Sequence, residues 1–227
     1  MDHVLLTSLF LGLALGVAHA LDPDHLVAVG TLAAESKNLR RSALLGVIWG
    51  VGHTCALGLV GTLVLRFKWI IPEHLATGME AAVGCMIFLL GFHLLWRCWQ
   101  PWTVHVHEHR HDGSTHSHVH LHGKDQEAHR HHIFASRVKA LGVGFVHGIA
   151  GSAALSLAVM STMPSMTMGL GYIVVFGVGS IGGMLLMSTL ISLPFVFVPG
   201  TWHHNMKVSA ALLAIGFGSY FTWSLLG

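Results

Sequence analysis

Apolar residues dominate six long segments of the chain, and polar residues gather between them. The segments cover residues 4–33, 43–65, 78–96, 138–160, 168–197 and 206–226. Each reaches roughly the 20 residues that an α-helix needs to cross the hydrocarbon core of a bilayer. None of them alternates apolar and polar residues as the strands of a membrane barrel do. The pattern therefore predicts six transmembrane helices, because lipid-exposed backbone permits only helices or closed barrels.

The composition indicates the same class. Hydrophobic residues make up 53% of the 227 residues and charged residues only 10%, whereas a soluble domain has about 25% charged residues. We therefore expect an all-α integral membrane protein surrounded by a lipid bilayer. The net charge of +2 does not indicate a nucleic-acid partner, because the basic residues flank the predicted spans.

Basic residues lie almost entirely on one side of the predicted membrane. Ten of the twelve Lys and Arg residues fall around the loops after the first, third and fifth spans, and only Arg66 and Lys68 follow the second span. By the positive-inside rule, the side with ten basic residues is cytoplasmic. We expect a multi-pass protein of the cell (inner) membrane, with both termini outward and the segment 99–137 in the cytoplasm.

A weak internal repeat divides the six spans into two sets of three. Three blocks of the two halves align in the same order, at an offset of 127 or 128 residues: Leu15–His19 with Val143–His147, Val47–His53 with Val174–Ser180, and Met79–Trp96 with Met206–Trp223. An odd number of spans per half inverts the second half, as in many secondary transporters; chance similarity of Gly- and Val-rich helices is the alternative. The predicted division is a first three-helix repeat over 1–98, a His-rich loop over 99–137 and a second repeat over 138–227.

Four ionisable side chains lie close together in the first span. His19, Asp22 and His25 are three residues apart, so they form a slanted stripe on one helix face. We expect the ion to bind His19, His25 and one of the two carboxylates, Asp22 or Asp24; alternatively, Asp24 orients a metal-binding imidazole. Pro23 removes a backbone donor, so the helix should break near it. Ionisable groups within a bilayer indicate a functional site, and broken helices mark the sites of carriers; a proline kink with hydrogen-bonded histidines is the alternative.

Two further histidines in predicted spans extend this candidate metal site. His53 lies in the second span, and His147 falls where His19 falls in the other half. Each could instead make only structural hydrogen bonds. Glu80 and His93 in the third span are weaker candidates. Imidazole-rich ligation with one or two carboxylates suits Ni, Co, Zn or Cu, and does not suit Mg or Ca, which prefer oxygen ligands.

The predicted cytoplasmic loop is rich in histidine. Eleven histidines fall within 28 residues, many at alternate positions, and such tracts are typical of metal binding. We expect auxiliary buffering, sensing or delivery of metal rather than a structured site; a solvated linker with incidental histidines is the alternative. The candidate residues are His105, His107, His109, His111, His116, His118, His120, His122, His129, His131 and His132.

The chain begins Met1-Asp2-His3, a sequence that can form a square-planar site for Ni(II) or Cu(II). The ligands would be the terminal amine, two deprotonated amides and the imidazole at position three. We interpret Met1, Asp2 and His3 as a candidate entry site on the outer face. A third-position histidine by chance is the competing interpretation.

Three of these stretches resemble a known family. Residues 19–26 read His-Ala-Leu-Asp-Pro-Asp-His-Leu and resemble the H-x4-D-H signature of the nickel/cobalt transporter (NiCoT) family. Gly52-His53-Thr54 resembles the glycine–histidine motif in the next helix of that family. Residues 147–155 are similar to a motif of the urease-accessory nickel permeases within the same superfamily.

The resemblance implies a membrane carrier for Ni2+ or Co2+, with His19, Asp24 and His25 as signature residues. The chain departs from the main family, which has eight spans and an acidic, threonine-rich second signature. Related nickel/cobalt exporters also carry a His-rich loop, so the resemblance leaves the direction of transport open.

The sequence thus predicts a carrier or facilitator that moves Ni2+, or Co2+, inward through a His/Asp site in the membrane. Zn2+ and Cu ions are alternative cargo, and cytoplasmic metallochaperones are candidate partners. We expect no resident cofactor and no enzymatic activity, because the chain has no nucleotide-binding motif and no clear nucleophile–base pair. The alternatives are an exporter with the same fold and a His-rich membrane metalloenzyme.

Overall fold

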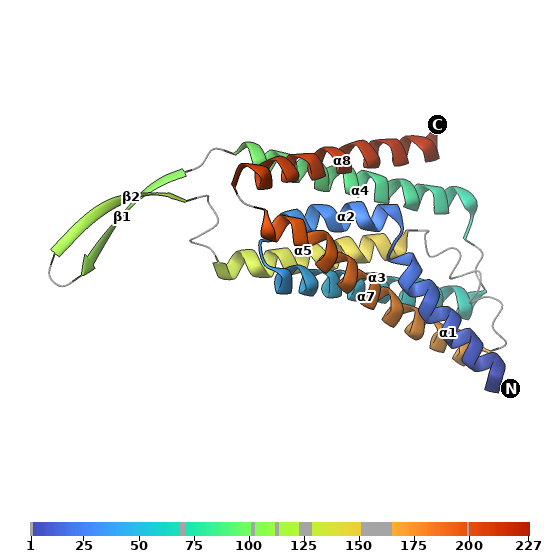
Figure 1. Ribbon diagram of the computed structural model, residues 1–227. Helices are drawn as coiled ribbons and strands as arrows, with labels where there is room; N and C mark the ends of the chain where they lie inside the picture. Colours follow the sequence, from blue (N-terminus) through green and yellow to red (C-terminus); the bar gives the residue numbers. More distant parts are fainter. Residues whose placement is uncertain are drawn as a thin grey trace.

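The computed structural model describes residues 2–68, 71–100, 103–111, 114–122, 129–150, 165–198 and 200–227. Within these residues it contains seven helices and one two-stranded sheet (Figure 1). The helices are α1 (Asp2–His19), α2 (Pro23–Ala34), α3 (Leu39–Phe67), α4 (Glu73–Trp99), α5 (His129–Ile149), α7 (Met166–Phe197) and α8 (Gly200–Leu226). The strands are β1 (Thr103–His111) and β2 (Ser114–His122). The predicted helical body is confirmed.

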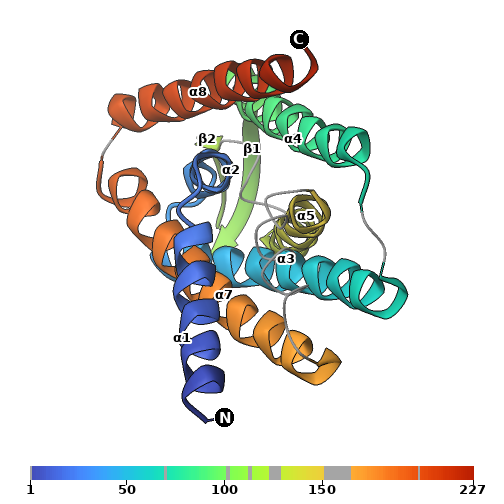
Figure 2. The same cartoon turned by 90° about the vertical axis from the view of Figure 1, so that its right-hand side faces the viewer.

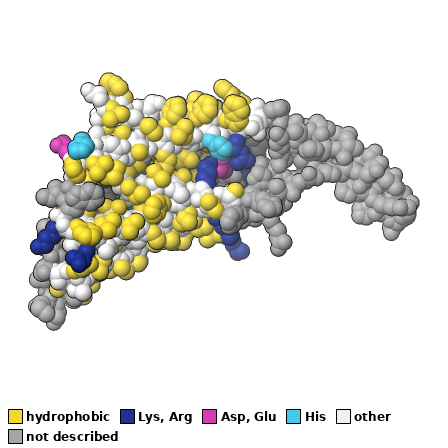
Figure 3. All heavy atoms as spheres, turned by 180° about the vertical axis from the view of Figure 1, so that it is seen from behind, with side chains coloured by type: hydrophobic (Ala, Val, Ile, Leu, Met, Phe, Trp, Pro, Cys, Tyr) yellow, Lys and Arg dark blue, Asp and Glu magenta, His cyan; other side chains and the backbone are white. Residues whose placement is uncertain are grey.

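Four of these helices can cross a bilayer. By length and composition α3, α4, α7 and residues Trp202–Leu226 of α8 qualify. Hydrophobic side chains cover the middle of the surface in Figure 3, and Lys and Arg side chains lie toward its ends. On α4, for example, Leu89 is 62% exposed and Trp96 is 57% exposed, which suits contact with lipid rather than water. The chain is a multi-pass membrane protein, as its composition predicts.

The first apolar segment is broken near Pro23, as predicted. α1 ends at His19, and α2 begins at Pro23. Proline is favoured at the first position of a helix, because the missing N–H would have no partner there. Asp22 precedes it with non-helical backbone angles (φ −57°, ψ 142°). The break therefore exposes the end of one helix and the start of another at the same point.

The short helix α2 lies inside the bundle, with α3 and α7 on one side and α4 and α8 on the other (Figure 2). α3 packs against both α5 and α7, α4 packs against α8, and α1 packs against α7. Both chain termini lie at one end of the bundle, and the hairpin of β1 and β2 projects from the other (Figure 1). We call these the termini end and the hairpin end.

Glycines bring pairs of these helices into backbone contact. A Cβ atom on Gly16 of α1 would collide with the carbonyl oxygen of Phe176 in α7. In the same way, a Cβ atom on Gly144 of α5 would collide with the carbonyl oxygen of Trp49 in α3. Small residues permit such close helix crossings in membranes. The two crossings fix α1 and α5 beside the residues that surround the candidate site.

The predicted loop 99–137 contains more regular structure than expected. β1 and β2 pair in antiparallel register, which places three histidines of one strand opposite three of the other: His105 with His120, His107 with His118, and His109 with His116. Histidine alternates with other residues in both strands, and a period of two fits a strand. In addition, α5 begins at His129, earlier than the predicted 138, so three loop histidines belong to its first turn.

Candidate metal centre

The break between α1 and α2 places four histidines at one point inside the bundle. His19 is the last residue of α1, and Asp24 and His25 lie in the first turn of α2. His53 of α3 and His147 of α5 approach them from the other side. His19 is 8% exposed, and the other three histidines are 0% exposed. The structure thus brings together His19, His25, His53 and His147, the four histidines of the predicted membrane site.

Three of these histidines form a group that we call the histidine triad: His19, His25 and His53. Their ligand atoms lie within 4.8 Å of one another, and the Nε2 atoms of His19 and His53 are 3.2 Å apart. Two nitrogens that bind one ion at about 2 Å each lie roughly 3 Å apart. This pair therefore already has the spacing of two ligands to a common ion.

Two carboxylates orient two of the three imidazoles of the histidine triad, those of His19 and His25. Asp22 Oδ2 lies 2.8 Å from His19 Nδ1, and Asp24 Oδ1 lies 3.0 Å from His25 Nδ1. When Nδ1–H donates to a carboxylate, Nε2 is left with a free lone pair for a metal ion. His25 Nε2 is buried and has no hydrogen-bond partner. A buried nitrogen without a partner needs an explanation, and a metal ion at the triad provides one.

Asp24 connects the histidine triad to the fourth histidine. Its Oδ2 accepts a hydrogen bond from His147 Nε2 at 2.8 Å. Its Oδ1 accepts from the ring and the backbone N–H of His25 at 3.0 and 2.9 Å. One ligand atom from each of Asp24, His25 and His147 also lies within 4.8 Å of the other two, which is close enough for a shared metal ion. Because Asp24 already accepts three hydrogen bonds, we interpret Asp24 and His147 as residues that hold the triad in place.

The two weaker candidates lie outside the histidine triad. Glu80 lines a cavity of about 370 Å³ together with Asp22 and Asp24, so it lies beside the centre. His93 lies on α4 with a side chain that is 54% exposed, and its Nε2 is 3.9 Å from Glu35 Oε1. His93 therefore belongs to a charged group at the hairpin end, where Glu35 also pairs with Lys139 at 3.4 Å.

Other predicted metal residues fall where side chains are not described. Met1 and the side chains of Asp2 and His3 lie outside the described part of the chain, as do the side chains of the eleven loop histidines. The backbone places eight of the loop histidines in β1 and β2 and three in the first turn of α5. Metal binding by these groups stays a prediction.

Two aromatic residues beside the histidines were missed by the sequence analysis. Trp49, which is 0% exposed, stacks on His25 with ring centroids 5.4 Å apart and 30° between the planes. It also lies 5.7 Å from the ring of His147. Phe176, 1% exposed, lies 5.5 Å from the ring of His19. The sequence does contain a signal for Trp49: it precedes His53 by about one helical turn and therefore lies on the same face of the helix.

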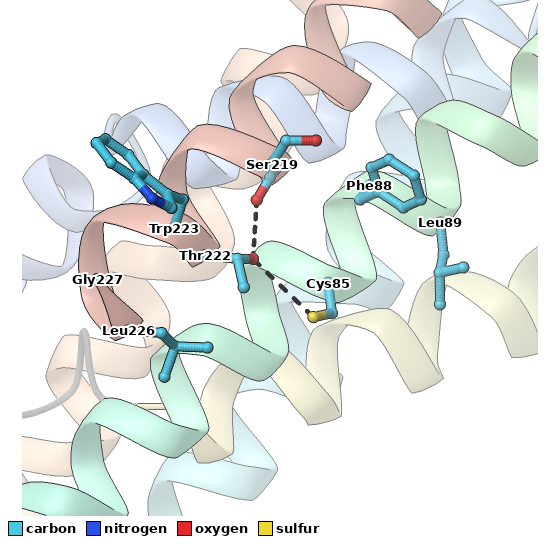
Figure 4. A pocket seen from close by; sticks show the side chains of 9 residues that line it. Cys85, Phe88, Leu89, Ser219, Thr222, Trp223, Leu226 and Gly227 are labelled. Atoms are coloured by element: carbon cyan, nitrogen blue, oxygen red, sulfur yellow. Dashed lines mark hydrogen bonds between the residues drawn. The ribbon is translucent and has the colours of Figure 1, made fainter.

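A separate cavity lies away from the histidine triad. It measures about 540 Å³ and lies between α4 and α8 (Figure 4). Its walls are mainly apolar, and none of the histidine triad lines it. The contact between Cys85 Sγ and Thr222 Oγ1, at 3.9 Å, is a polar contact within it. The position on α4 and α8 makes this cavity a lipid-facing groove.

Comparison with known proteins identifies a relative. The chain is 40% identical over 200 residues to the urease accessory protein UreH of Bacillus sp. (strain TB-90), which covers 86% of this chain and 81% of the relative. No family model matches the chain, and no solved structure matches it. The relative is named as an accessory protein, which confirms the expectation that the chain is not itself an enzyme. The chain belongs to the family of the urease accessory protein UreH.

Proposed function

We propose that the protein transports Ni2+ across the membrane, with Co2+ as a second cargo, and that the ion binds the histidine triad on its way. The relative is named as a urease accessory protein, and the resemblance to urease-accessory nickel permeases points to nickel. Neutral imidazoles suit this ion and its neighbours Co, Cu and Zn. The chemistry of the site therefore selects the class of ion, and the family favours nickel within it.

One observation carries the proposal: a buried group of three imidazoles lies at a helix break, and two of the three are hydrogen-bonded to carboxylates. Buried histidines inside a membrane protein are costly unless they have partners or a function. Here His25 Nε2 is left without a hydrogen bond, although Asp24 holds the same ring firmly from its other nitrogen. Such an arrangement is typical of a metal-binding histidine and its supporting carboxylate.

The packing of the helices supports the inverted repeat as the framework for transport. The repeat relates α1, α3 and α4 to α5, α7 and α8. Under that relation the packing of α1 against α7 becomes the packing of α5 against α3, and the pairs α3–α7 and α4–α8 map onto themselves. All four contacts are present. Transporters of this architecture place their sites between the repeats near the middle of the membrane, and we propose the same position for the histidine triad.

The glycine contacts follow the same relation at the level of residues. A Cβ atom on Gly52 would collide with the carbonyl oxygen of Leu141, and one on Gly179 would collide with that of Leu13. Gly179 is the counterpart of Gly52, and Leu141 is the counterpart of Leu13, at the offsets of 127 and 128 residues found in the sequence. Chance similarity would not place equivalent residues in equivalent contacts. We therefore keep the division into repeats 1–98 and 138–227.

The proposed orientation places the termini end outside the cell and the hairpin end in the cytoplasm, in the inner membrane. This follows the distribution of basic residues. Nickel would then enter from the termini end, reach the histidine triad and leave toward the histidines of β1 and β2. These histidines would buffer the ion or pass it to a cytoplasmic metallochaperone.

Nickel accumulation in cells tests the proposal and the direction together. Cells that express the protein should accumulate more radioactive nickel than cells with an empty vector, and His25→Ala should remove the difference. His93→Ala is the matched control, because His93 is a histidine in a span that lies outside the triad. A lower nickel content in expressing cells would indicate export, and no difference with protein present in the membrane would reject nickel transport.

A further inference from the structure

Two aromatic rings cover the histidines from opposite ends of the bundle. α3 runs from the hairpin end to the termini end, so Trp49 lies on the hairpin side of His53. α7 runs in the opposite direction (Figure 1), so Phe176 lies on the termini side of the residues that follow it. Both rings are buried. Neither Trp49 nor Phe176 can bind a metal ion, so their place beside four histidines needs another explanation.

The repeat relates the two rings to each other. Phe176 is the counterpart of Trp49 at the offset of 127 residues, and His147 is the counterpart of His19 at 128. The contacts match: Trp49 lies 5.7 Å from His147, and Phe176 lies 5.5 Å from His19. The glycine crossings match as well, because Gly144 abuts Trp49 and Gly16 abuts Phe176. Trp49 and Phe176 therefore occupy equivalent positions in the two halves and make equivalent contacts.

On the hairpin side of Trp49 the protein is tightly packed, but some of the buried atoms there are polar. A cavity on the hairpin side, lined by Trp49, Ser42 and Ser188 among apolar residues, holds only about 10 Å³, roughly the room for one water molecule. Trp49 Nε1 and Ser42 Oγ are buried there without hydrogen-bond partners. Buried polar atoms are nearly always satisfied, and a space of this size between two polar atoms suits a single water molecule.

The space beyond Phe176 is closed by packing. Tyr172, Ile173 and Leu57 form one buried cluster with Phe176, and the ring centroids of Tyr172 and Phe176 are 6.2 Å apart. Along α7 one buried aromatic layer separates the histidine triad from the termini end, and along α3 another separates it from the hairpin end. Neither ring lines the cavity of Asp22, Asp24 and Glu80 beside the centre, so the two rings close the routes along α7 and α3.

We propose that Trp49 and Phe176 are a pair of gates, each closing one side of the histidine triad, and that ion passage requires the two rings to move away in turn. The proposal rests on the proposed function, since it assumes that an ion crosses at the triad. Inverted repeats provide the physical basis, because exchanging the conformations of the two halves exchanges an open side for a closed one. Trp49 controls exchange with the hairpin side, and Phe176 controls exchange with the termini side.

Release of bound nickel to a chelator on one side tests the pair. Right-side-out and inside-out membrane vesicles that contain the full chain are loaded with Ni2+, and a membrane-impermeant chelator is added outside. Trp49→Ala should speed release to the hairpin side about tenfold, equivalent to a barrier lower by about 1.4 kcal/mol, and leave release to the termini side unchanged. Phe176→Ala should do the reverse.

Matched variants separate gating from damage to the fold. Trp96→Ala and Phe92→Ala remove exposed rings of the same types from α4 and should change neither rate. Trp49→Phe and Phe176→Trp exchange each ring for its counterpart and should keep release close to wild type. If the alanine variants do not reach the membrane, Trp49→Leu and Phe176→Leu carry the same one-sided expectation.

Equal acceleration on both sides, or unchanged release in both variants while the wild type transports nickel, would overturn the gating proposal alone. Failure of the wild type to bind or transport nickel would instead overturn the proposed function. The two failures are therefore distinguishable within one experiment.

Discussion

Asp24 Oδ2 accepts a hydrogen bond from His147 Nε2 at a distance of 2.8 Å. The two residues are 123 positions apart, one in α2 and one in α5, so this bond joins the two proposed repeats at the metal centre. Asp24 also holds His25 through its other oxygen. A change at Asp24 therefore acts on the histidine triad from the first half and from the second half.

Asp24→Asn should weaken nickel binding without removing it. The amide offers one acceptor oxygen where the carboxylate offers two, so either His25 or His147 loses its partner. Loss of a supporting carboxylate costs about 10–100-fold in metal affinity, and isothermal titration of the purified protein with Ni2+ measures the change. Glu73→Gln, which removes a carboxylate from the exposed start of α4, is the control. Unchanged affinity in Asp24→Asn would contradict the orienting role.

His25→Ala and His147→Ala should differ in severity. Loss of His25 removes a direct ligand and should abolish binding, whereas loss of His147 should reduce affinity about as much as Asp24→Asn. The double variant Asp24→Asn/His147→Ala should bind nickel nearly as well as either single variant, because the two residues act as one unit. Fully additive losses would show that His147 binds the ion independently of Asp24.

Nickel transport should fall as the pH decreases from about 7.5 to about 5, because an imidazole that has taken up a proton cannot bind a metal ion. The sign is fixed by the chemistry: protons compete with Ni2+ for the same nitrogens. Initial rates of nickel uptake at constant membrane potential measure the effect. Flat rates across this range would argue against histidine ligation.

Gly144→Ala should destabilise the protein. The added methyl group would collide with the backbone and ring of Trp49, and overpacking of this kind costs about 1–3 kcal/mol. Gly142→Ala in the same helix meets nothing within 4 Å and should be tolerated. The melting temperatures of both variants in detergent provide the comparison. Equal stability of the two would show that α3 and α5 do not cross as closely as described.

The hairpin register predicts a difference between two pairs of substitutions that remove the same number of histidines. His107→Ala/His118→Ala removes one facing pair and leaves the other two intact, whereas His107→Ala/His116→Ala breaks two pairs. Side chains of directly opposed residues lie about 4.5–5.5 Å apart at Cβ, close enough to share an ion. His107→Ala/His116→Ala should therefore bind less nickel than His107→Ala/His118→Ala when binding is measured by equilibrium dialysis. Equal binding would favour loose chelation independent of strands.

The helical body and much of the centre could be predicted from the sequence. Apolar length predicts the spans, and Pro23 predicts the break, because both follow from local physical constraints. The spacing of His19, Asp22 and His25 predicts one stripe on a helix. In the structure the break changes this, because His19 is the last residue of α1 whereas His25 lies in the first turn of α2.

The remaining features depend on contacts between distant segments. The bond from His147 to Asp24 and the stacking of Trp49 on His25 arise only when α3 and α5 pack beside the break. The sequence repeat aligned Trp49 with Phe176, yet a pair of bulky apolar residues in a membrane span is ordinary packing until the histidines beside them are known. The strands of the loop are the exception, because the alternation of its histidines is itself a pattern with period two that indicates strands.

Nickel flux into protein-containing vesicles tests the central claim most directly. Purified wild type, His25→Ala and His93→Ala are reconstituted in equal amounts, and Ni2+ influx is followed with a trapped metal-sensitive dye. We expect flux with the wild type and with His93→Ala and none above protein-free vesicles with His25→Ala. Undiminished flux in His25→Ala, or no flux with the correctly folded wild type, would contradict transport through the histidine triad.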